Sequence, residues 1–145
     1  MKVLSVSEPL LADWLRLRIL LWPNTEDAHL IEMRQLLAEK QTLQLMAYSN
    51  NQAVAMLEAS IRHEYVNGTE TSPVAYLEGI YVCSEFRRLG VATNLIRQAE
   101  QWATQFACTE FASDTAVDNL VGQAMHKALG FQETERVIYF SKKIK

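Results

Sequence analysis

Cysteine, proline and glycine are scarce in this 145-residue chain, which contains two cysteines, three prolines and five glycines. The cysteines, Cys83 and Cys108, are too few for a disulfide framework and cannot form a Cys-x-x-Cys zinc site, so we expect reduced structural thiols. The three histidines are scattered and form no His-Glu-x-x-His pair. The sequence therefore predicts no metal site.

Neither sign of charge dominates, and long hydrophobic runs are missing. The chain has 14 basic and 17 acidic residues, so it lacks the basic excess that binds a nucleic-acid backbone. No segment reaches the roughly 18 uninterrupted apolar residues of a membrane span, and the first residues lack the apolar run of a signal peptide. We therefore expect a cytoplasmic protein with no nucleic-acid or membrane partner.

The residues that are present have the composition of a globular domain, with 49% hydrophobic and 21% charged residues. Length and composition predict one domain over residues 1–145. Hydrophobic periodicity and turn residues predict the order β-α-α-β-β-β-α-β-α-β, typical of a mixed sheet with helices on its faces. The predicted strands are 2–6, 42–48, 53–61, 74–82, 108–113 and 136–142, and the predicted helices are 10–21, 26–40, 88–105 and 119–129.

The segment 74–82 is almost continuously apolar, which predicts a central strand covered on both faces. Glu78 is its one charged residue, and we expect a buried carboxylate there, which must be partnered or functional. Two interpretations remain open: a structural carboxylate with satisfied hydrogen bonds, or a ligand of a substrate amine that also acts as general base. The adjacent Gly79 permits a close backbone approach or a bulge.

The six residues Arg-Arg-Leu-Gly-Val-Ala at 87–92 join this strand to the next predicted helix. A helix N-terminus presents free backbone N–H groups and the positive end of the helix dipole. Gly90 and Ala92 leave the turn bare enough for a pyrophosphate to reach those groups, and Arg87 and Arg88 add positive charge. The alternative is a turn glycine beside a solvated arginine pair. The segment matches neither a Walker loop nor Gly-x-Gly-x-x-Gly.

The strand–Arg-x-x-Gly-x-Ala–helix unit, with Asn119 and then Leu-Gly-Phe at 129–131, resembles the GNAT superfamily of acetyl-CoA-dependent N-acetyltransferases. Segments 76–82 and 130–136 are similar to bacterial aminoglycoside 6′-N-acetyltransferases of type I. This resemblance implies the acyl-CoA N-acyltransferase fold, an α/β (α+β) architecture. Its sheet would be mixed, mostly antiparallel and splayed in the middle, with helices on both faces.

The implied reaction is transfer of acetyl from acetyl-CoA to the 6′-amine of an aminoglycoside by direct attack, with no covalent intermediate, in a homodimer. Main-chain groups at the end of strand 74–82 would bind the pantetheine arm and stabilise the oxyanion. Asn119 would reach the cofactor, unless it only starts a helix next to Asp118, a candidate cap. The implied cofactor residues are Ile80, Tyr81, Val82, Arg87, Arg88, Gly90, Val91, Ala92 and Asn119.

The resemblance also assigns residues to the acceptor. Glu78 would be the base, and Asp114 and Glu135 would join it at the mouth of the splayed sheet to face the ammonium groups. Trp22 and Tyr65 would contact the sugar rings. The alternatives are an Asx turn at Asp114, a loop acid paired with a neighbouring arginine at Glu135, and ordinary packing for both aromatic residues.

The general acid stays unassigned. The slot where many GNAT enzymes carry a tyrosine looks like His126 here, which is either an acid or a surface side chain.

Two other functions also stay open: acetylation of a polyamine, a peptide N-terminus or another small amine, and non-catalytic binding of acyl-CoA. Glu78 argues against the second, because a module that only binds has no need of a lone carboxylate beside the thioester.

Overall fold

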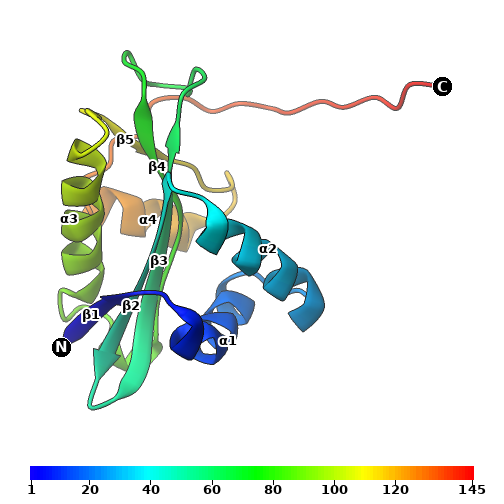
Figure 1. The fold of residues 1–145 in the computed structure, drawn as a ribbon. Coiled ribbons are helices and arrows are strands. Elements are labelled where there is room, and N and C mark those ends of the chain that lie inside the picture. Colours follow the sequence, from blue (N-terminus) through cyan, green and yellow to red (C-terminus); the bar gives the residue numbers. More distant parts are fainter.

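The computed structural model describes all of residues 1–145, and it contains one five-stranded sheet with helices on both faces (Figure 1). Neighbouring strands are antiparallel up to the fourth, and the fifth is parallel to the fourth. The predicted mixed, mostly antiparallel sheet is therefore confirmed. The strands follow the chain order as β1 (Lys2–Ser5), β2 (Thr42–Ser49), β3 (Gln52–Arg62), β4 (Val74–Val82) and β5 (Phe111–Ser113).

Two helices cover each face of the sheet (Figure 1). The first pair follows the short 3-10 turn η1 (Glu8–Leu10), which contains Pro9. Thr25 caps the second helix of this pair by accepting a hydrogen bond from the Ala28 N–H at 3.2 Å. Another 3-10 turn, η2 (Ser84–Phe86), precedes the second pair. The helices are α1 (Leu11–Leu21) and α2 (Glu26–Ala38) on one face, and α3 (Val91–Thr104) and α4 (Leu120–Ala128) on the other.

The sheet separates two hydrophobic cores. Trp14, Leu17 and Met33 pack between the sheet and the α1–α2 pair, whereas Leu95 and Ile96 of α3 pack on the opposite face. Successive side chains of a strand point to opposite faces, so a strand under both cores is buried continuously. This pattern is clearest in β3, while β4, the strand expected to be central, has an exposed position at Glu78.

The pairing between β4 and β5 is short. It runs only from Ala75 opposite Phe111 to Leu77 opposite Ser113, whereas β4 continues to Val82. β5 begins later than predicted, after a turn in which Ala107 has a φ of 61°. Beyond Leu77 the two strands have separated, and this gap is the expected splay of the sheet.

The predicted strand 136–142 is wrong for this single chain. Residues 131–145 form neither helix nor strand. Phe131 still packs on the core and Thr134 lies against Gly68, and the residues after them run away from the body of the protein (red in Figure 1). No strand edge of the same chain pairs with them, so the hydrogen bonds of a ladder have no partner there. The apolar side chains from Val137 onward are consequently exposed, and Phe140 is 91% accessible to solvent. Elsewhere, no helix is both long and apolar enough to cross a membrane.

Candidate functional site

A β-bulge redirects Glu78. Glu58 of β3 lies opposite Gly79, and the next residue, Ala59, lies opposite Leu77, so Glu78 has no partner across the ladder. A bulge of this kind bends the strand and re-aims a side chain. The Glu78 side chain is 33% exposed as a result. The expected buried carboxylate at Glu78 is therefore wrong, although the bulge anticipated beside Gly79 is present.

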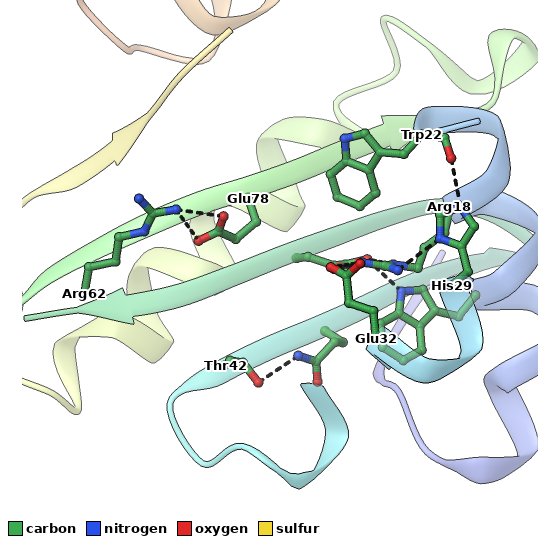
Figure 2. Close-up of polar contacts among 10 residues, drawn as sticks. Arg18, Trp22, His29, Glu32, Thr42, Arg62 and Glu78 are labelled. Atoms are coloured by element: carbon green, nitrogen blue, oxygen red, sulfur yellow. Dashed lines mark hydrogen bonds and ion pairs between the residues drawn. The ribbon is translucent and has the colours of Figure 1, made fainter. Parts of the chain in front are cut away.

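Glu78 is held in an ion pair on the strand surface. Arg62 Nη2 donates to both carboxylate oxygens at 3.0 Å, and Ser60 Oγ donates to Oε2 at 2.5 Å (Arg62 and Glu78 in Figure 2). A carboxylate has about four lone-pair sites, and these three hydrogen bonds leave one of them on Oε1. The carboxylate is thus oriented and still able to accept a proton or a hydrogen bond.

The same arginine connects Glu78 to Asp114. Arg62 Cζ lies 3.5 Å from the centre of the Tyr76 ring, and the Tyr76 hydroxyl donates to Asp114 at the end of β5. Burial, followed by the neighbouring Asp114, raises the pKa of Tyr76 well above its ordinary value. Tyr76 therefore stays protonated as a donor. Asp114 is held by this side-chain bond, and not by the Asx turn considered from the sequence.

A cavity of about 110 Å³ lies where β4 and β5 separate. Both Glu78 and Asp114 line it, so the structure brings these two predicted acids together. Its other walls come from the end of α1, from β4 and β5, and from α4, and they consist of Leu21, Trp22, Leu77, Gly79, Ile80, Ser113, Met125 and His126.

A larger cavity of about 400 Å³ shares Trp22 and Glu78 with the first. It lies against α1 and α2, and three carboxylates line it together with one guanidinium, which gives it an acidic character. Its remaining lining residues are Arg18, Pro23, Asn24, Ala28, His29, Glu32, Leu36 and Glu58.

Trp22 forms a wall between the two cavities. It follows α1 directly, and its ring packs so closely on Gly79 that a Cβ at position 79 would overlap the ring carbons. The Arg18 guanidinium lies 5.1 Å from the centre of this ring. Trp22 therefore both packs against β4 and lines the cavities. Glycine is required at position 79 because the Trp22 ring occupies the space that a side chain would need.

The structure does not bring Tyr65 and Glu135 to either cavity. Tyr65 is 73% exposed in the loop after β3, and Glu135 lies on the C-terminal segment that leaves the body. The predicted convergence of three acids thus holds for Glu78 and Asp114 only in this single chain. Arg136 pairs with Glu133 at 2.5 Å, and not with Glu135 as considered from the sequence.

The turn at 87–92 has the open geometry expected of an anion site. Gly90 has a φ of 82° and precedes the first residue of α3, and nothing lies within 4 Å of the place where its Cβ would be. Arg88 also has a positive φ, 62°, so the helix starts at Val91 and not at Arg88 as predicted. Ala92 is the second residue of that helix.

Arg87 and Arg88 are both exposed, and Arg87 also contacts the end of β4. Its Nε donates to the Val82 carbonyl at 2.8 Å, and its guanidinium lies 5.7 Å from the Tyr81 ring centre. The side chains of Ile80 and Val82 are buried in the core on the α3 face. Since these two side chains are buried, a ligand between β4 and β5 would contact the main chain of residues 80–82.

Asn119 is the N-cap of α4. Its Oδ1 accepts from the Gly122 N–H at 2.9 Å, and its Nδ2 donates to Thr115 Oγ1 at 3.1 Å. In this structure Asn119 makes the contacts expected of a residue that starts a helix. The cap of α4 is therefore Asn119 and not Asp118.

His126 is a half-buried member of the cavity wall and not a surface side chain. Its Nδ1 lies 2.7 Å from the Gly122 carbonyl, which can only accept, so Nδ1 carries a proton. Its Nε2 lies 2.8 Å from Ser113 Oγ. Sequence reasoning missed Ser113; its only signal was its position as the last residue of a strand next to Asp114.

Sequence reasoning also missed Arg18, Glu58 and His29, which are buried behind Trp22. The available signal was a lone charge in each of two apolar segments, Arg18 in 17–22 and Glu58 in 53–61. Three or more His, Cys, Asp or Glu side chains in a metal-binding arrangement do not occur anywhere in the structure.

The model of the acetyltransferase (GNAT) family matches residues 11–131, and the chain belongs to this family. An aminoglycoside N(6′)-acetyltransferase type 1 from Acinetobacter baumannii is 64% identical, with 99% of both chains covered. The apo crystal structure of the aminoglycoside antibiotic 6′-N-acetyltransferase AAC(6′)-IG from Acinetobacter haemolyticus is 68% identical, with a TM-score of 0.99 and 100% of each chain covered.

A third relative was solved with a ligand. The structure of AAC(6′)-Iy in complex with a bisubstrate analogue, CoA-S-monomethyl-acetylneamine, has a TM-score of 0.93 to this chain and is 42% identical. The alignment covers 99% of this chain and 98% of that one. The predicted fold and family are confirmed by these comparisons.

Proposed function

We propose that this chain, as one domain of residues 1–145, transfers the acetyl group of acetyl-CoA to the 6′-amino group of aminoglycosides and so inactivates them. The main structural support is the pair of carboxylates, Glu78 and Asp114, in one cavity at the splay of the sheet. Relatives that are 63–68% identical over 99% of this chain bear the name of this activity.

The acceptor amine must lose a proton before it can attack, because its ammonium form has no lone pair. Glu78 accepts that proton, directly or through a water, on the side of Oε1 that Arg62 leaves free. The neutral amine then attacks the thioester carbonyl, forming the N–C bond, and the C–S bond breaks with its electron pair going to sulfur. The extra proton on the attacking nitrogen leaves with this step and is taken up by the CoA thiolate, so that an amide and the free thiol result. Asp114 accepts hydrogen bonds from the ammonium groups of the acceptor.

Acetyl-CoA is held by main-chain groups and not by a metal. The backbone of Ile80, Tyr81 and Val82 borders the gap left by β5, where an N–H stabilises the developing oxyanion. The pyrophosphate lies at the N-terminus of α3, on the open side of Gly90, with Arg88 as its charged neighbour. Asn119 contacts the cofactor from the start of α4.

Trp22, Tyr65 and Glu135 complete the acceptor site. Trp22 stacks on a sugar ring from the wall between the two cavities. Tyr65 and Glu135 lie on segments that contact each other, because Gly68 packs against Thr134. In this single chain both residues lie outside the two cavities, so in the proposed site the two segments move toward the acceptor together.

The protein acts as a homodimer in the cytoplasm. The exposed apolar side chains of the C-terminal segment, such as Ile138, Tyr139 and Phe140, support pairing with a second copy, because monomers rarely expose such a run. The two cysteines are free, which is consistent with a reducing compartment.

The test is release of CoA thiol with matched acceptors. An aminoglycoside with a 6′-amine is compared with the analogue that has a 6′-hydroxyl, and with spermidine and a peptide N-terminus. We expect turnover only with the 6′-amine compound. Equal turnover with spermidine or the peptide would favour an acetyltransferase of another amine, and acetyl-CoA binding without any turnover would favour the binding module.

A further inference from the structure

Behind Trp22 lies a buried polar cluster that the proposed reaction does not use. Its members are Arg18 of α1, His29 of α2 and Glu58 of β3, which are 1%, 4% and 3% exposed. Figure 2 shows Arg18 and His29 beneath the Trp22 side chain. Charged groups at this depth are uncommon unless each is paired.

The guanidinium of Arg18 is the centre of the cluster. It binds Glu58 with two parallel hydrogen bonds, from Nε at 2.6 Å and from Nη2 at 3.0 Å. Nη2 also donates to Glu32 at 3.0 Å, and the indole N–H of Trp14 donates to Glu58 at 3.0 Å. These contacts fix the plane of the guanidinium.

His29 connects this plane to Trp22. Arg18 Nη1 lies 3.1 Å from His29 Nδ1, and an arginine can only donate, so Nδ1 is the acceptor. The proton of the neutral ring is then on Nε2, which donates to the Trp22 carbonyl at 2.8 Å. The Trp22 N–H donates to the Arg18 carbonyl at 2.7 Å, which is the last main-chain bond of α1, so the side-chain contact that the cluster adds to the Trp22 backbone is the one from His29.

A merely structural role does not account for this arrangement. Well-packed apolar residues often replace a buried ion pair with no loss of stability. Here a directional hydrogen bond from His29 Nε2 ends on the Trp22 carbonyl at 2.8 Å, and the Trp22 ring is also faced by Arg18 at 5.1 Å and packed on Gly79. The cluster therefore determines where the wall between the two cavities stands.

We propose that Arg18, Glu58 and His29 are positioning residues that hold Trp22 in place, and thereby set the affinity for the acceptor without affecting the affinity for acetyl-CoA. This inference rests on the proposed function, because it takes the acceptor to be the aminoglycoside that contacts Trp22. The glutamine variant of His29 retains an amide N–H that can reach the Trp22 carbonyl, whereas the leucine variant retains no donor.

The experiment compares His29→Leu and His29→Gln in steady-state kinetics. Losing the hydrogen bond to Trp22 should raise KM for the aminoglycoside about tenfold, with kcat and KM for acetyl-CoA within about twofold. His29→Gln should recover most of the loss. Tyr48→Phe is the matched control, because it removes another contact of α1 with the sheet, the bond from Tyr48 to Asp13 at 2.9 Å, without involving Trp22.

Near-ultraviolet circular dichroism of Trp22, obtained by subtracting the Trp22→Phe spectrum, gives a readout without turnover. It should change in His29→Leu and stay unchanged in Tyr48→Phe. An unchanged Trp22 spectrum in a folded His29→Leu protein would overturn the proposal, as would an equal rise in KM in Tyr48→Phe. A wild-type protein that does not acetylate aminoglycosides would refute the proposed function instead. The circular dichroism of Trp22 would still decide whether His29 positions Trp22.

Discussion

The Tyr76 hydroxyl donates to Asp114, so a side chain of β4 is bonded to the carboxylate that ends β5, next to the point where the two strands separate. Arg62 lies on the ring of the same tyrosine and binds Glu78. The two carboxylates of the smaller cavity are consequently connected through one arginine and one tyrosine. We therefore expect a substitution of one carboxylate to affect the position of the other.

Asp114→Asn should raise KM for the aminoglycoside and change kcat little. The loss of one charge-assisted hydrogen bond, about 1.5–3 kcal/mol, corresponds to roughly a tenfold to hundredfold increase. Steady-state kinetics between low and high salt measures it, because the salt dependence of KM should weaken with one charge fewer. Glu110→Gln is a suitable control, since Glu110 bonds only the 70–71 loop. A loss confined to kcat would contradict a ligand role for Asp114.

Glu78→Gln should behave differently from Asp114→Asn. The amide retains the shape of the carboxylate but cannot accept the amine proton, so kcat should fall at pH 7 by roughly a hundredfold. Activity should recover partly toward pH 9.5, where more acceptor is already unprotonated. Rates from pH 6 to 9.5 test this, and a normal kcat with only a raised KM would make Glu78 a ligand and exclude it as the base.

Gly90→Val should weaken acetyl-CoA binding. The side chain would enter the open space beside the start of α3, and the positive φ of 82° disfavours a β-branched residue. Gly130→Val is a matched control for strain, because Gly130 also has a positive φ, 97°, and open space around it. Calorimetry with CoA should detect at least a tenfold weaker affinity in the first variant only. Equal affinities would argue against the pyrophosphate site.

Removal of residues 136–145 should convert a dimer to a monomer. The apolar side chains exposed on this segment have no partner in the single chain, so a second copy is the surface that we propose covers them. Sedimentation of the full-length and shortened proteins at several concentrations measures the change. A full-length protein that sediments as a monomer at all concentrations would refute the dimer.

Alkaline pH should destabilise the protein through Tyr48. Burial, and then the bond to Asp13, raises the pKa of Tyr48 from 10.0 to about 12 in the folded protein. A raised folded-state pKa stabilises the fold fully below pH 10, and this contribution is lost as the pH rises through about 12. Urea unfolding from pH 8 to 12 should show this loss in the wild type. Tyr48→Phe should show a weaker dependence over the same range.

Local signals allowed much of the fold to be predicted. The predicted helices 10–21 and 26–40 and strands 42–48 and 53–61 are present within a few residues of their expected bounds, because the turns and caps that delimit them act over a few residues. Gly90 was identified by its place between strand and helix. Strand 136–142 could not be judged in this way, because a strand needs an edge to pair with, and this chain supplies none beside that segment.

Burial of the acidic residues also depends on contacts that are distant in sequence. Glu58 and Glu78 each sit as lone charges in apolar strands, and the sequence suggested burial for Glu78. The structure buries Glu58, since Arg18 approaches it from a helix 40 positions away in sequence, and exposes Glu78 at a bulge. Neither the distant guanidinium nor the extra residue of the ladder leaves a trace in local periodicity.

The bulge makes the position of Glu78 depend on strand length. Leu77 and Ile80 both face the core on the α3 side although they are three residues apart, because Glu78 is counted in β4 and skipped in the ladder. One residue inserted after Glu58 would give β3 as many residues as β4 across the bulge, so that Glu78 would face a partner on β3. The site would then be lost with every original side chain still present, a failure that a scan of single substitutions cannot reveal and that a scan of insertions can.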